Sequence, residues 1–406
     1  MPTADLRIGV VGLGHRGELA KQVHRPGAGA AIVACADPSE RAQARARQFF
    51  GPRVRVYTSH VEMLADDLDA VMVLTPDNLH RQPVLDFLEA GTTVFVEKPL
   101  AINTEDCDQM LQSAMINGSR LYVGHNLRHA ATMRAMRDLV EQGTIGQVRT
   151  VWCRHFVGHG GDFYFKDWHA DRRNTNSLLL QKGVHDIDVM HWLAGGFCRR
   201  VVALGDLMVY GANGDRHERT GQLMQDWFDP AGWPPRSLTG LNPVIDVEDI
   251  SMMMGRLDNG VLISYQQCHF TPDYWRNFTV IGDEGRLENF GDLQGAVVKV
   301  WNRGRSEYRE QADQVVEVSS SEGTHGGADA SLVAEFLRFI VSGGATDSSP
   351  IAAREAVAAA DAATRSLRQG GQPVHISPPE SQVAMYFSGG QPEAQQTLPR
   401  PNPRRD

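Results

Sequence analysis

The first 125 residues alternate short apolar runs with longer stretches in which apolar positions recur at the spacing of a helix. The apolar runs are rich in Val, Ala, Ile and Leu and occupy residues 7–11, 31–36, 54–57, 70–74, 93–96 and 120–123. Helical spacing is found at residues 39–50, 78–90 and 104–117. Strands that are apolar on both faces and alternate with helices are typical of a parallel sheet covered on both sides. We therefore predict an α/β fold whose N-terminal domain, residues 1–125, contains a doubly wound sheet of six strands.

The pattern changes after a predicted helix at residues 133–142. From here on, strand-like runs are separated by Gly, Asn and Asp turns rather than by helices. They lie at residues 148–156, 201–210, 250–256, 260–269, 277–281, 286–289 and 296–301. Because few helices separate these runs, we predict a C-terminal α+β domain, residues 126–377, with a large, mostly antiparallel open sheet. Helices predicted at residues 330–341 and 351–367 are expected to pack back onto the N-terminal domain.

Two segments have no regular pattern. Residues 213–242 contain two tryptophans and a Pro-Pro pair and form a long irregular excursion. Loops of this length inside a compact domain usually serve a pocket or an interface. Residues 378–406 are rich in Pro, Gln, Gly and Arg, a composition that predicts a mobile or partner-hugging tail.

Composition narrows the class of protein. The chain is 42% hydrophobic and carries a net charge of −9 with scattered basic residues, so neither nucleic acid nor an anionic membrane is expected as a partner. Five cysteines without paired or zinc-like spacing predict reduced thiols and no metal site. The sequence shows neither a leader pattern nor an apolar run long enough to cross a bilayer. We therefore expect a soluble, cytoplasmic protein.

A glycine-rich turn follows the first predicted strand and precedes a helix. It consists of Gly12, Leu13, Gly14, His15, Arg16 and Gly17. Glycines at this spacing let the backbone approach a pyrophosphate, and Asp37 ends the second strand about 20 residues later, where it can hold both ribose hydroxyls. Its charge would repel a 2′-phosphate, which favours NAD over NADP as the cofactor. The alternative is a plain tight turn with Asp37 capping the next helix. Arg41 could reach a 2′-phosphate or simply be exposed.

Two further motifs lie at the carboxyl ends of predicted strands, where doubly wound sheets bind ligands. The fourth strand is followed by a group that can line the nicotinamide ribose or form a capped helix start: Thr75, Pro76, Asn78 and His80. After the fifth strand, Lys98 lies between Glu97 and Pro99, and the proline restricts its backbone. A lysine aimed in this way can exchange a proton with the oxygen on the carbon that exchanges hydride. The alternative is a surface lysine paired with Glu97.

The C-terminal part has two segments with candidate chemistry. If residues 178–193 are helical, Gln181, His185 and Asp188 share one face, and His185 is either a satisfied core residue or a proton-transfer group. Residues 163–174 mix aromatic side chains with hydrogen-bonding groups. This mixture suits the recognition of a polyol, although a loop packed on the sheet explains the aromatics equally well.

Taken together, these motifs resemble those of the glucose-fructose oxidoreductase, inositol dehydrogenase and MocA family, over residues 6 to about 373. The motifs that carry the resemblance are the glycine turn, Thr75-Pro76 with His80, the Glu97-Lys98-Pro99 triplet, and residues 124–128, 143–146 and 183–188. The resemblance implies that Lys98 polarises the reacting oxygen and that His185 is the general acid or base. It implies that Glu97, Lys98 and Asn126 contact the cofactor. It also implies a substrate site made of Lys98, Arg128, Tyr164, Trp168, His169, Gln181, Lys182 and His185.

The chain departs from the family pattern at two adjacent positions of this site. The family usually has an aspartate four residues before the histidine, where this chain has Gln181. Lys182 beside it is also atypical and either faces an anionic substrate or points to solvent. The family commonly forms dimers or tetramers through the outer face of the second sheet, so a homodimer or homotetramer is expected.

We therefore expect an NAD-dependent oxidoreductase whose partner is a small carbohydrate. Hydride would pass between nicotinamide and a ring carbinol of a sugar, sugar derivative or cyclitol. Two alternatives are a redox-neutral, NAD-dependent glycosidase, which oxidises a ring hydroxyl only transiently to allow elimination, and an inactive cofactor-binding regulator. The pair Lys98 and His185 disfavours the last.

Overall fold

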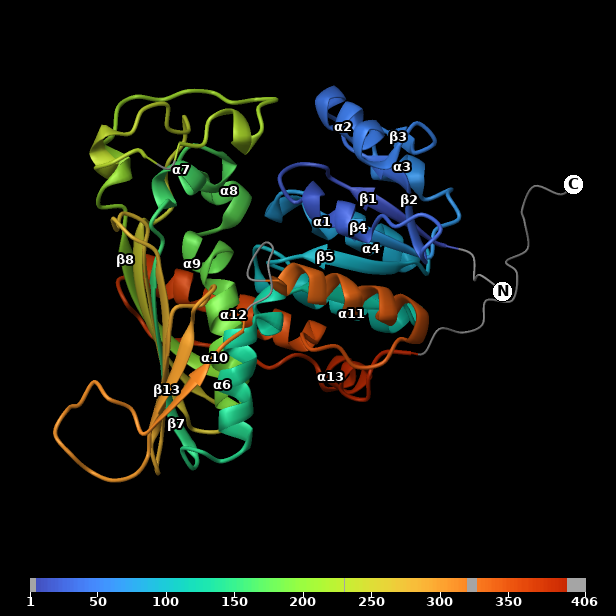
Figure 1. The fold of residues 1–406 in the computed structure, drawn as a ribbon. Coiled ribbons are helices and arrows are strands. Elements are labelled where there is room, and N and C mark those ends of the chain that lie inside the picture. Colours follow the sequence, from blue (N-terminus) through green and yellow to red (C-terminus); the bar gives the residue numbers. More distant parts are fainter. Residues whose placement is uncertain (1–4, 230, 320–326, 393–406) are drawn as a thin grey trace, which may run out of the picture.

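The chain folds around two sheets. The computed structural model describes residues 5–229, 231–319 and 327–392. One sheet has six strands and the other has nine. Figure 1 shows the first in the half formed by the N-terminal part of the chain and the second in the other half. None of the described helices is long and apolar enough to span a membrane.

The N-terminal sheet is parallel throughout and has the strand order β3-β2-β1-β4-β5-β6. This is the order of a Rossmann dinucleotide-binding domain, in which the strand order reverses between β1 and β4. Its strands are β1 (Leu6–Val11), β2 (Ala30–Ala36), β3 (Arg55–Tyr57), β4 (Ala70–Val73), β5 (Thr93–Glu97) and β6 (Leu121–Gly124). The connecting helices are α1 (Gly17–Val23), α2 (Glu40–Phe50), α3 (His60–Met63), α4 (Arg81–Glu89) and α5 (Thr104–Asn117). The doubly wound sheet predicted from the sequence is confirmed.

The second sheet has the order β14-β13-β12-β11-β7-β10-β9-β8-β15, and among its described strands β7 with β10 is the single parallel pair. Its longer strands are β7 (Val148–Phe156), β8 (Cys198–Asp206), β9 (Ile250–Leu257), β10 (Leu262–Cys268), β11 (Trp275–Gly282), β12 (Arg286–Phe290) and β13 (Val297–Trp301). The mostly antiparallel sheet is thus confirmed. Two short strands were not predicted, β14 (Gln314–Glu317) and β15 (Val374–His375), because four largely exposed residues and a two-residue strand leave almost no pattern.

Helices cover the inner face of the second sheet and join it to the first domain. They are α6 (Ala131–Glu141), α10 (Gly183–Ala194) and the alanine-rich α12 (Pro350–Arg368). Helix α12 lies against β8 and α10 on one side and against α5 of the first domain on the other. Helix α11 (Ala328–Ser342) packs on the first domain, where Phe336 and Phe339 contact Tyr122. The two domains therefore share a continuous apolar core.

The C-terminal segment differs from the mobile tail that its composition suggested. Residues Ser381–Ser388 form helix α13, and the Tyr386 hydroxyl donates to the carbonyl of Ser119 at 2.9 Å. The Gln391 side chain accepts from the amide of Leu121 and donates to its carbonyl, both at 2.7 Å. Side-chain pairing with the edge of the first sheet, which composition does not reveal, thus fixes this segment. Residues 393–406, the rest of the predicted tail, lie outside the described residues.

The irregular excursion leaves the second sheet after β8 and returns at β9. It contains three short turns of 3₁₀ helix, η4 (Tyr210–Ala212), η5 (Met224–Asp226) and η6 (Pro235–Ser237). In Figure 1 its yellow-green trace lies above the C-terminal domain and extends toward α2. There, Asp226 forms a bidentate ion pair with Arg41 of α2, with Nη2 and Oδ1 2.9 Å apart. Arg41 therefore contacts the other domain.

Candidate active site

A cavity of about 1000 Å³ lies between the two domains at the carboxyl edge of the parallel sheet. We call the part lined by the first domain the Rossmann side and the part lined by the second domain the C-terminal side. The cavity brings together most of the predicted site residues. These are Gly12, Gly14, His15, Arg16, Asp37, Thr75, Pro76, Asn78, Glu97, Lys98, Asn126, Tyr164, Trp168, His169, Gln181, Lys182 and His185.

The glycine turn forms one end of the Rossmann side. Gly12 has φ of +85°, and a Cβ atom there would lie 2.8 Å from the backbone nitrogen of Thr75. At Gly14 a Cβ atom would meet no atom within 4 Å, so it would project into open space that a ligand can use. The Asp37 carboxylate accepts from the amides of Leu13 and Ser39 at 2.8 and 2.9 Å. This loop leaves room for a pyrophosphate and places a carboxylate at the cavity wall, which fits a dinucleotide.

Lys98 lies where the Rossmann side meets the C-terminal side. It directly follows β5, and its Nζ donates to the main-chain carbonyl of Gln181 at 3.1 Å. Glu97 is instead held by Arg16, whose Nε donates to it at 2.7 Å. The alternative of a surface lysine paired with Glu97 therefore does not describe this geometry. Burial lowers the pKa of Lys98, and the nearby carboxylates of Asp77 and Glu97 oppose that shift.

His185 and Gln181 lie on two consecutive short helices. Helix α9 (Leu178–Gln181) ends before Lys182, and α10 begins at Gly183, so the single helix expected here is broken. The His185 side chain is buried, and its Nδ1 has no hydrogen-bond partner among the described residues. Burial and the charge of Lys98 hold the pKa of His185 well below its usual value. The Gln181 Oε1 is likewise buried without a described partner.

Arg128 and Asp188, which were expected near His185, belong to a separate buried cluster. Arg128 lies in η2 (Asn126–His129) and forms a bidentate ion pair with Asp188 at 2.7 and 2.8 Å. It also donates to the carbonyl of Asp347 at 2.8 Å. Neither Arg128 nor Asp188 is among the described residues that line the cavity. We therefore correct the interpretation of Arg128 as a substrate contact and of Asp188 as sharing the site of His185, because each satisfies the other.

Three predicted cofactor residues lie behind the cavity wall and do not line the cavity. The His80 ring is buried between the carbonyls of Pro99 and Thr75, at 2.8 and 3.0 Å, and so connects the turns after β4 and β5. Leu13 packs in the core, and Gly17 begins α1, where a Cβ atom would lie 3.2 Å from the Leu13 side chain. These residues shape the walls, but the cavity lining given above does not include them.

Aromatic side chains line much of the C-terminal side. Tyr164 ends α7 (Gly160–Tyr164), and η3 (Trp168–Ala170) places Trp168 and His169 in a stacked pair with ring centroids 3.8 Å apart. The short helix α8 (Arg172–Thr175) follows. The Nδ1 of His169 is buried without a partner among the described residues. Flat rings next to free polar atoms suit a ligand with C–H faces and hydroxyl groups.

Lys182 adds a cation to the C-terminal side. Burial, reinforced by the charges of Arg276 and Lys98, lowers its pKa to about 7. Its side chain lines the cavity and makes no ion pair or hydrogen bond with any described residue. Of the two alternatives left open by the sequence, a cavity-facing lysine describes the structure.

Asp77 is a cavity residue that the sequence interpretation missed. It begins η1 (Asp77–Leu79), is 4% exposed, and has an Oδ2 atom without a described hydrogen-bond partner. Burial raises its pKa to about 8, although the charge of Lys98 opposes the shift. It lies between Pro76 and Asn78, which the sequence predicts as cofactor residues, so its place in the motif already indicated a position near the cavity. An acid in the first turn of a helix has a ready structural explanation, and its burial could not be foreseen.

A network behind the C-terminal side anchors α10. Asp186 accepts from the hydroxyl of Tyr265 at 2.8 Å, lies 2.7 Å from Nδ1 of His155, and pairs with Arg276 at 2.9 Å. The charge of Arg276 is the largest effect that holds the pKa of Asp186 below its usual range, against the effect of burial. This network orients the helix that carries His185.

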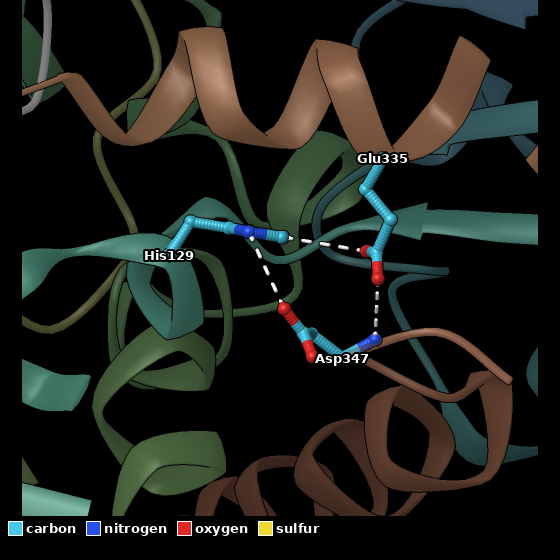
Figure 2. A group of neighbouring side chains, drawn as sticks. All are labelled: His129, Glu335 and Asp347. Atoms are coloured by element: carbon cyan, nitrogen blue, oxygen red, sulfur yellow. Dashed lines mark hydrogen bonds and ion pairs between the residues drawn. The ribbon is translucent and has the colours of Figure 1, made fainter. Parts of the chain in front are cut away.

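Figure 2 shows a group of potential metal ligands next to η2. Nε2 of His129 lies 3.5 Å from Glu335, and Nδ1 lies 3.6 Å from Asp347. Each carboxylate therefore pairs with a different nitrogen of the His129 ring. The guanidinium of Arg134 also pairs with Asp347 and lies 3.2 Å from Nδ1. We interpret the group as an ion-pair network that connects α11 to the junction between the domains.

The fold and the cavity define a two-domain, NAD-binding oxidoreductase. The model of the oxidoreductase family with an NAD-binding Rossmann fold matches residues 6–125, and the model of its C-terminal alpha/beta domain matches residues 137–376. The chain therefore belongs to the glucose-fructose oxidoreductase, inositol dehydrogenase and MocA family. The resemblance found in the sequence and the expected NAD cofactor are both confirmed.

The similarity to individual relatives is lower and covers only part of the chain in the sequence comparisons. The chain is 34% identical to an inositol 2-dehydrogenase of Gluconacetobacter diazotrophicus over 47% of its own length and 55% of that protein. It is 28% identical to a 2,7-anhydro-N-acetylneuraminate hydratase of Mediterraneibacter gnavus over 55% of its own length and 62% of that protein. A solved levoglucosan dehydrogenase in complex with NADH and levoglucosan superposes with a TM-score of 0.74 at 18% identity, over 92% of this chain and 99% of that one. The last comparison shows the shared fold.

Proposed function

We propose that this protein is an NAD-dependent oxidoreductase that acts on a ring hydroxyl of a sugar, sugar derivative or cyclitol. One observation carries the proposal. Lys98, at the end of the Rossmann strand β5, reaches the C-terminal side and donates to the Gln181 carbonyl in the cavity that His185 and the aromatic wall also line. The curated relatives named as sugar or cyclitol enzymes support this substrate class.

The chain's own residues bind and orient both ligands. When bound, NAD supplies the acceptor or donor of hydride at the nicotinamide ring. The Lys98 ammonium stabilises negative charge that develops on the reacting oxygen, and His185 exchanges a proton with it. Tyr164 and Trp168 provide ring faces for the C–H surface of the substrate. Asp37 accepts hydrogen bonds from the adenosine ribose and disfavours a 2′-phosphate.

The test is a panel of free sugars, sugar acids and cyclitols incubated with oxidised NAD. We expect net formation of NADH with at least one compound, and none with a Lys98→Met variant that still binds NAD. Calorimetry of the unmodified protein should show tighter binding of NAD than of NADP. Equal affinity for the two cofactors would contradict the role of Asp37, and a panel without any NADH would contradict the dehydrogenase activity.

A redox-neutral glycosidase is the second candidate, and the excursion favours it. Gly221, Gln222, Leu223 and Met224 line the cavity, so the segment can help to enclose a second group attached to the sugar. Chromophoric glycosides incubated with catalytic NAD distinguish the two activities by stoichiometry. A glycosidase releases aglycone over many turnovers while the absorbance of NADH stays flat. A dehydrogenase produces one NADH for each product.

We also propose that the protein forms a homodimer or homotetramer through the outer face of the second sheet. Five large apolar side chains on β7 to β10 are about half or more exposed on that sheet: Trp152, Leu204, Met252, Met254 and Leu262. Exposed apolar patches of this kind mark interaction surfaces. Light scattering should give a mass above one chain, and Met254→Glu should reduce it. A monomeric unmodified protein would contradict the proposal.

Unpaired cysteines support a cytoplasmic location, which we also propose. All five cysteines are free, and Cys35, Cys107, Cys153 and Cys198 are buried. Thiols in this state suit a reducing compartment. Fractionation of cells that express the full-length protein tests the location.

A further inference from the structure

We propose that Asp77 supplies the carboxylate that accepts the proton of the reacting hydroxyl, in place of the acid that the family usually carries at position 181. The inference rests on the proposed oxidoreductase function. It assigns a role to a residue of the Rossmann side that the mechanism above does not use. It also explains how the site can operate with Gln181, which cannot hold a negative charge.

Asp77 lines the cavity and has a buried oxygen atom that is available to a ligand. The residue begins η1 directly after Pro76, and its side chain lines the cavity. It is 4% exposed, yet its Oδ2 has no hydrogen-bond partner among the described residues. A buried polar atom without a partner costs free energy unless a ligand or water satisfies it. The substrate's hydroxyl group can satisfy Oδ2.

The groups that face Asp77 favour proton exchange at this site. Lys98 and Glu97 come from the end of β5, and the side chain of Gln181 in α9 forms a hydrogen bond with the carboxyl group, which leaves Oδ2 as its unpartnered atom. Tyr164 lies across the cavity on α7, close enough for the charge of Asp77 to affect its phenol. Glu97 is already held by Arg16. Asp77 is therefore the carboxyl with an unpartnered oxygen next to Lys98 in the described part of the cavity.

His185 alone is a poor final acceptor for this proton. Its ring is buried, and Lys98, His125, Arg276 and Lys182 all disfavour a positive charge on it. In the family pattern an aspartate at position 181 could offset that cost, whereas Gln181 cannot. The pKa of Asp77, about 8, lies in the range where a general base is effective near neutral pH. The negative charge required for proton transfer has thus moved from the C-terminal side to the Rossmann side.

The step balances as follows for an oxidation. The O–H bond of the substrate breaks, and its proton leaves the oxygen through His185 and ends on the Asp77 carboxylate, with Lys98 donating a hydrogen bond to the oxygen. The C–H bond at the same carbon breaks, and its hydrogen leaves with two electrons as hydride to oxidised NAD. The carbinol becomes a carbonyl, Asp77 becomes a carboxylic acid, and Lys98 keeps its charge. Release of the Asp77 proton to solvent completes the cycle.

The kinetic test uses an exchange of carboxylates between the two positions. Asp77→Asn should lower kcat by about 10²-fold or more, with little change in KM or in NAD affinity, because a proton-transfer group is lost. It should also remove the rise of kcat with pH near 8 that the unmodified enzyme is expected to show. Adding Gln181→Asp to this variant should restore part of kcat, because a carboxylate again lies next to Lys98. Unchanged kcat and pH dependence in Asp77→Asn would overturn the proposal.

An infrared measurement tests Asp77 without turnover. Difference spectra of the unmodified protein between pH 6 and pH 10 should contain the band of a protonated carboxylic acid that titrates near pH 8. The band should be absent in Asp77→Asn and present in Asp167→Asn, which removes another cavity-lining aspartate whose pKa is raised by burial. A band that persists in Asp77→Asn would overturn the assignment. A titrating Asp77 in a protein that oxidises no compound of the panel would instead contradict the proposed function.

Discussion

The two sides of the cavity are built in different ways. On the Rossmann side, contacts made within or between short motifs satisfy most polar groups. Asp37 accepts from two backbone amides, and Arg16 pairs with Glu97. On the C-terminal side, His169, Gln181 and His185 each leave a buried polar atom without a described partner. Thr75 and Asp77 are the exceptions on the Rossmann side, each with one buried oxygen without a described partner. The glycine turn and Glu97 are therefore held without a ligand, whereas the C-terminal side leaves more buried polar atoms for a ligand to satisfy.

Lys98 should show the largest effect, because it connects the two sides. Lys98→Met removes the ammonium next to the reacting oxygen but keeps a side chain of similar length. We expect kcat to fall by about 10²–10³-fold, the typical effect of losing one group that stabilises developing charge. NAD affinity should change little, since the glycine turn and Asp37 are unaffected. A variant with near-normal turnover would show that the lysine only bridges the domains.

Gly12 tests whether the Rossmann side is held by its backbone. Gly12→Ala places a Cβ atom 2.8 Å from the Thr75 nitrogen at φ of +85°. The added Cβ atom must displace the glycine turn or the turn after β4, and we expect NAD to bind about 5- to 150-fold more weakly, which corresponds to about 1–3 kcal/mol, as measured by calorimetry. Gly51→Ala is the matched control, because φ is +84° but no atom lies within 4 Å. It should lower the melting temperature without affecting NAD affinity.

The sequence predicted more of the Rossmann side of the cavity than of the C-terminal side. The glycine turn, Asp37, Thr75 and Lys98 were identified because each follows a predicted strand, and the ends of parallel strands meet at one edge. On the C-terminal side, Arg128 was misassigned because nothing local shows that Asp188 satisfies it. Asp77 was missed because its role depends on burial by another domain. Contacts between distant segments, such as Gln391 with Leu121, leave no periodic pattern in the sequence.

Lys182, on the C-terminal side, should make the stability of the protein depend on pH. Its pKa is lowered to about 7 in the folded protein, while the unfolded chain keeps the usual value of 10.5. Between these values the unfolded state binds more protons, so this residue makes stability rise with pH from about 7 upward. Lys182→Met removes the dependence. We therefore expect the variant's melting temperature, relative to the unmodified protein, to be higher at pH 6 than at pH 9.

The same melting experiment has a control and a contradicting outcome. Lys299→Met, which removes a partly exposed lysine on β13 that does not line the cavity, is the control at both pH values. If Lys182→Met shifts the melting temperature equally at both pH values, the lysine is solvated rather than held in the cavity. Lys182 would then count as an exposed surface residue and not as part of the C-terminal side of the cavity.

Arg41 should show the smallest effect, because its ion pair with Asp226 lies on the surface. The excursion lines the cavity through residues 221–224, and this pair ties it to α2. Exposed ion pairs contribute little and are screened by salt. We expect Arg41→Ala to weaken NAD binding at most a few-fold at low ionic strength, and not measurably at high salt. An Asp226→Ala variant should behave in the same way, since each removes the same contact. Loss of NAD binding in Arg41→Ala but not in Asp226→Ala would show that the arginine contacts the cofactor itself. The NAD preference assigned to Asp37 would then depend on both residues.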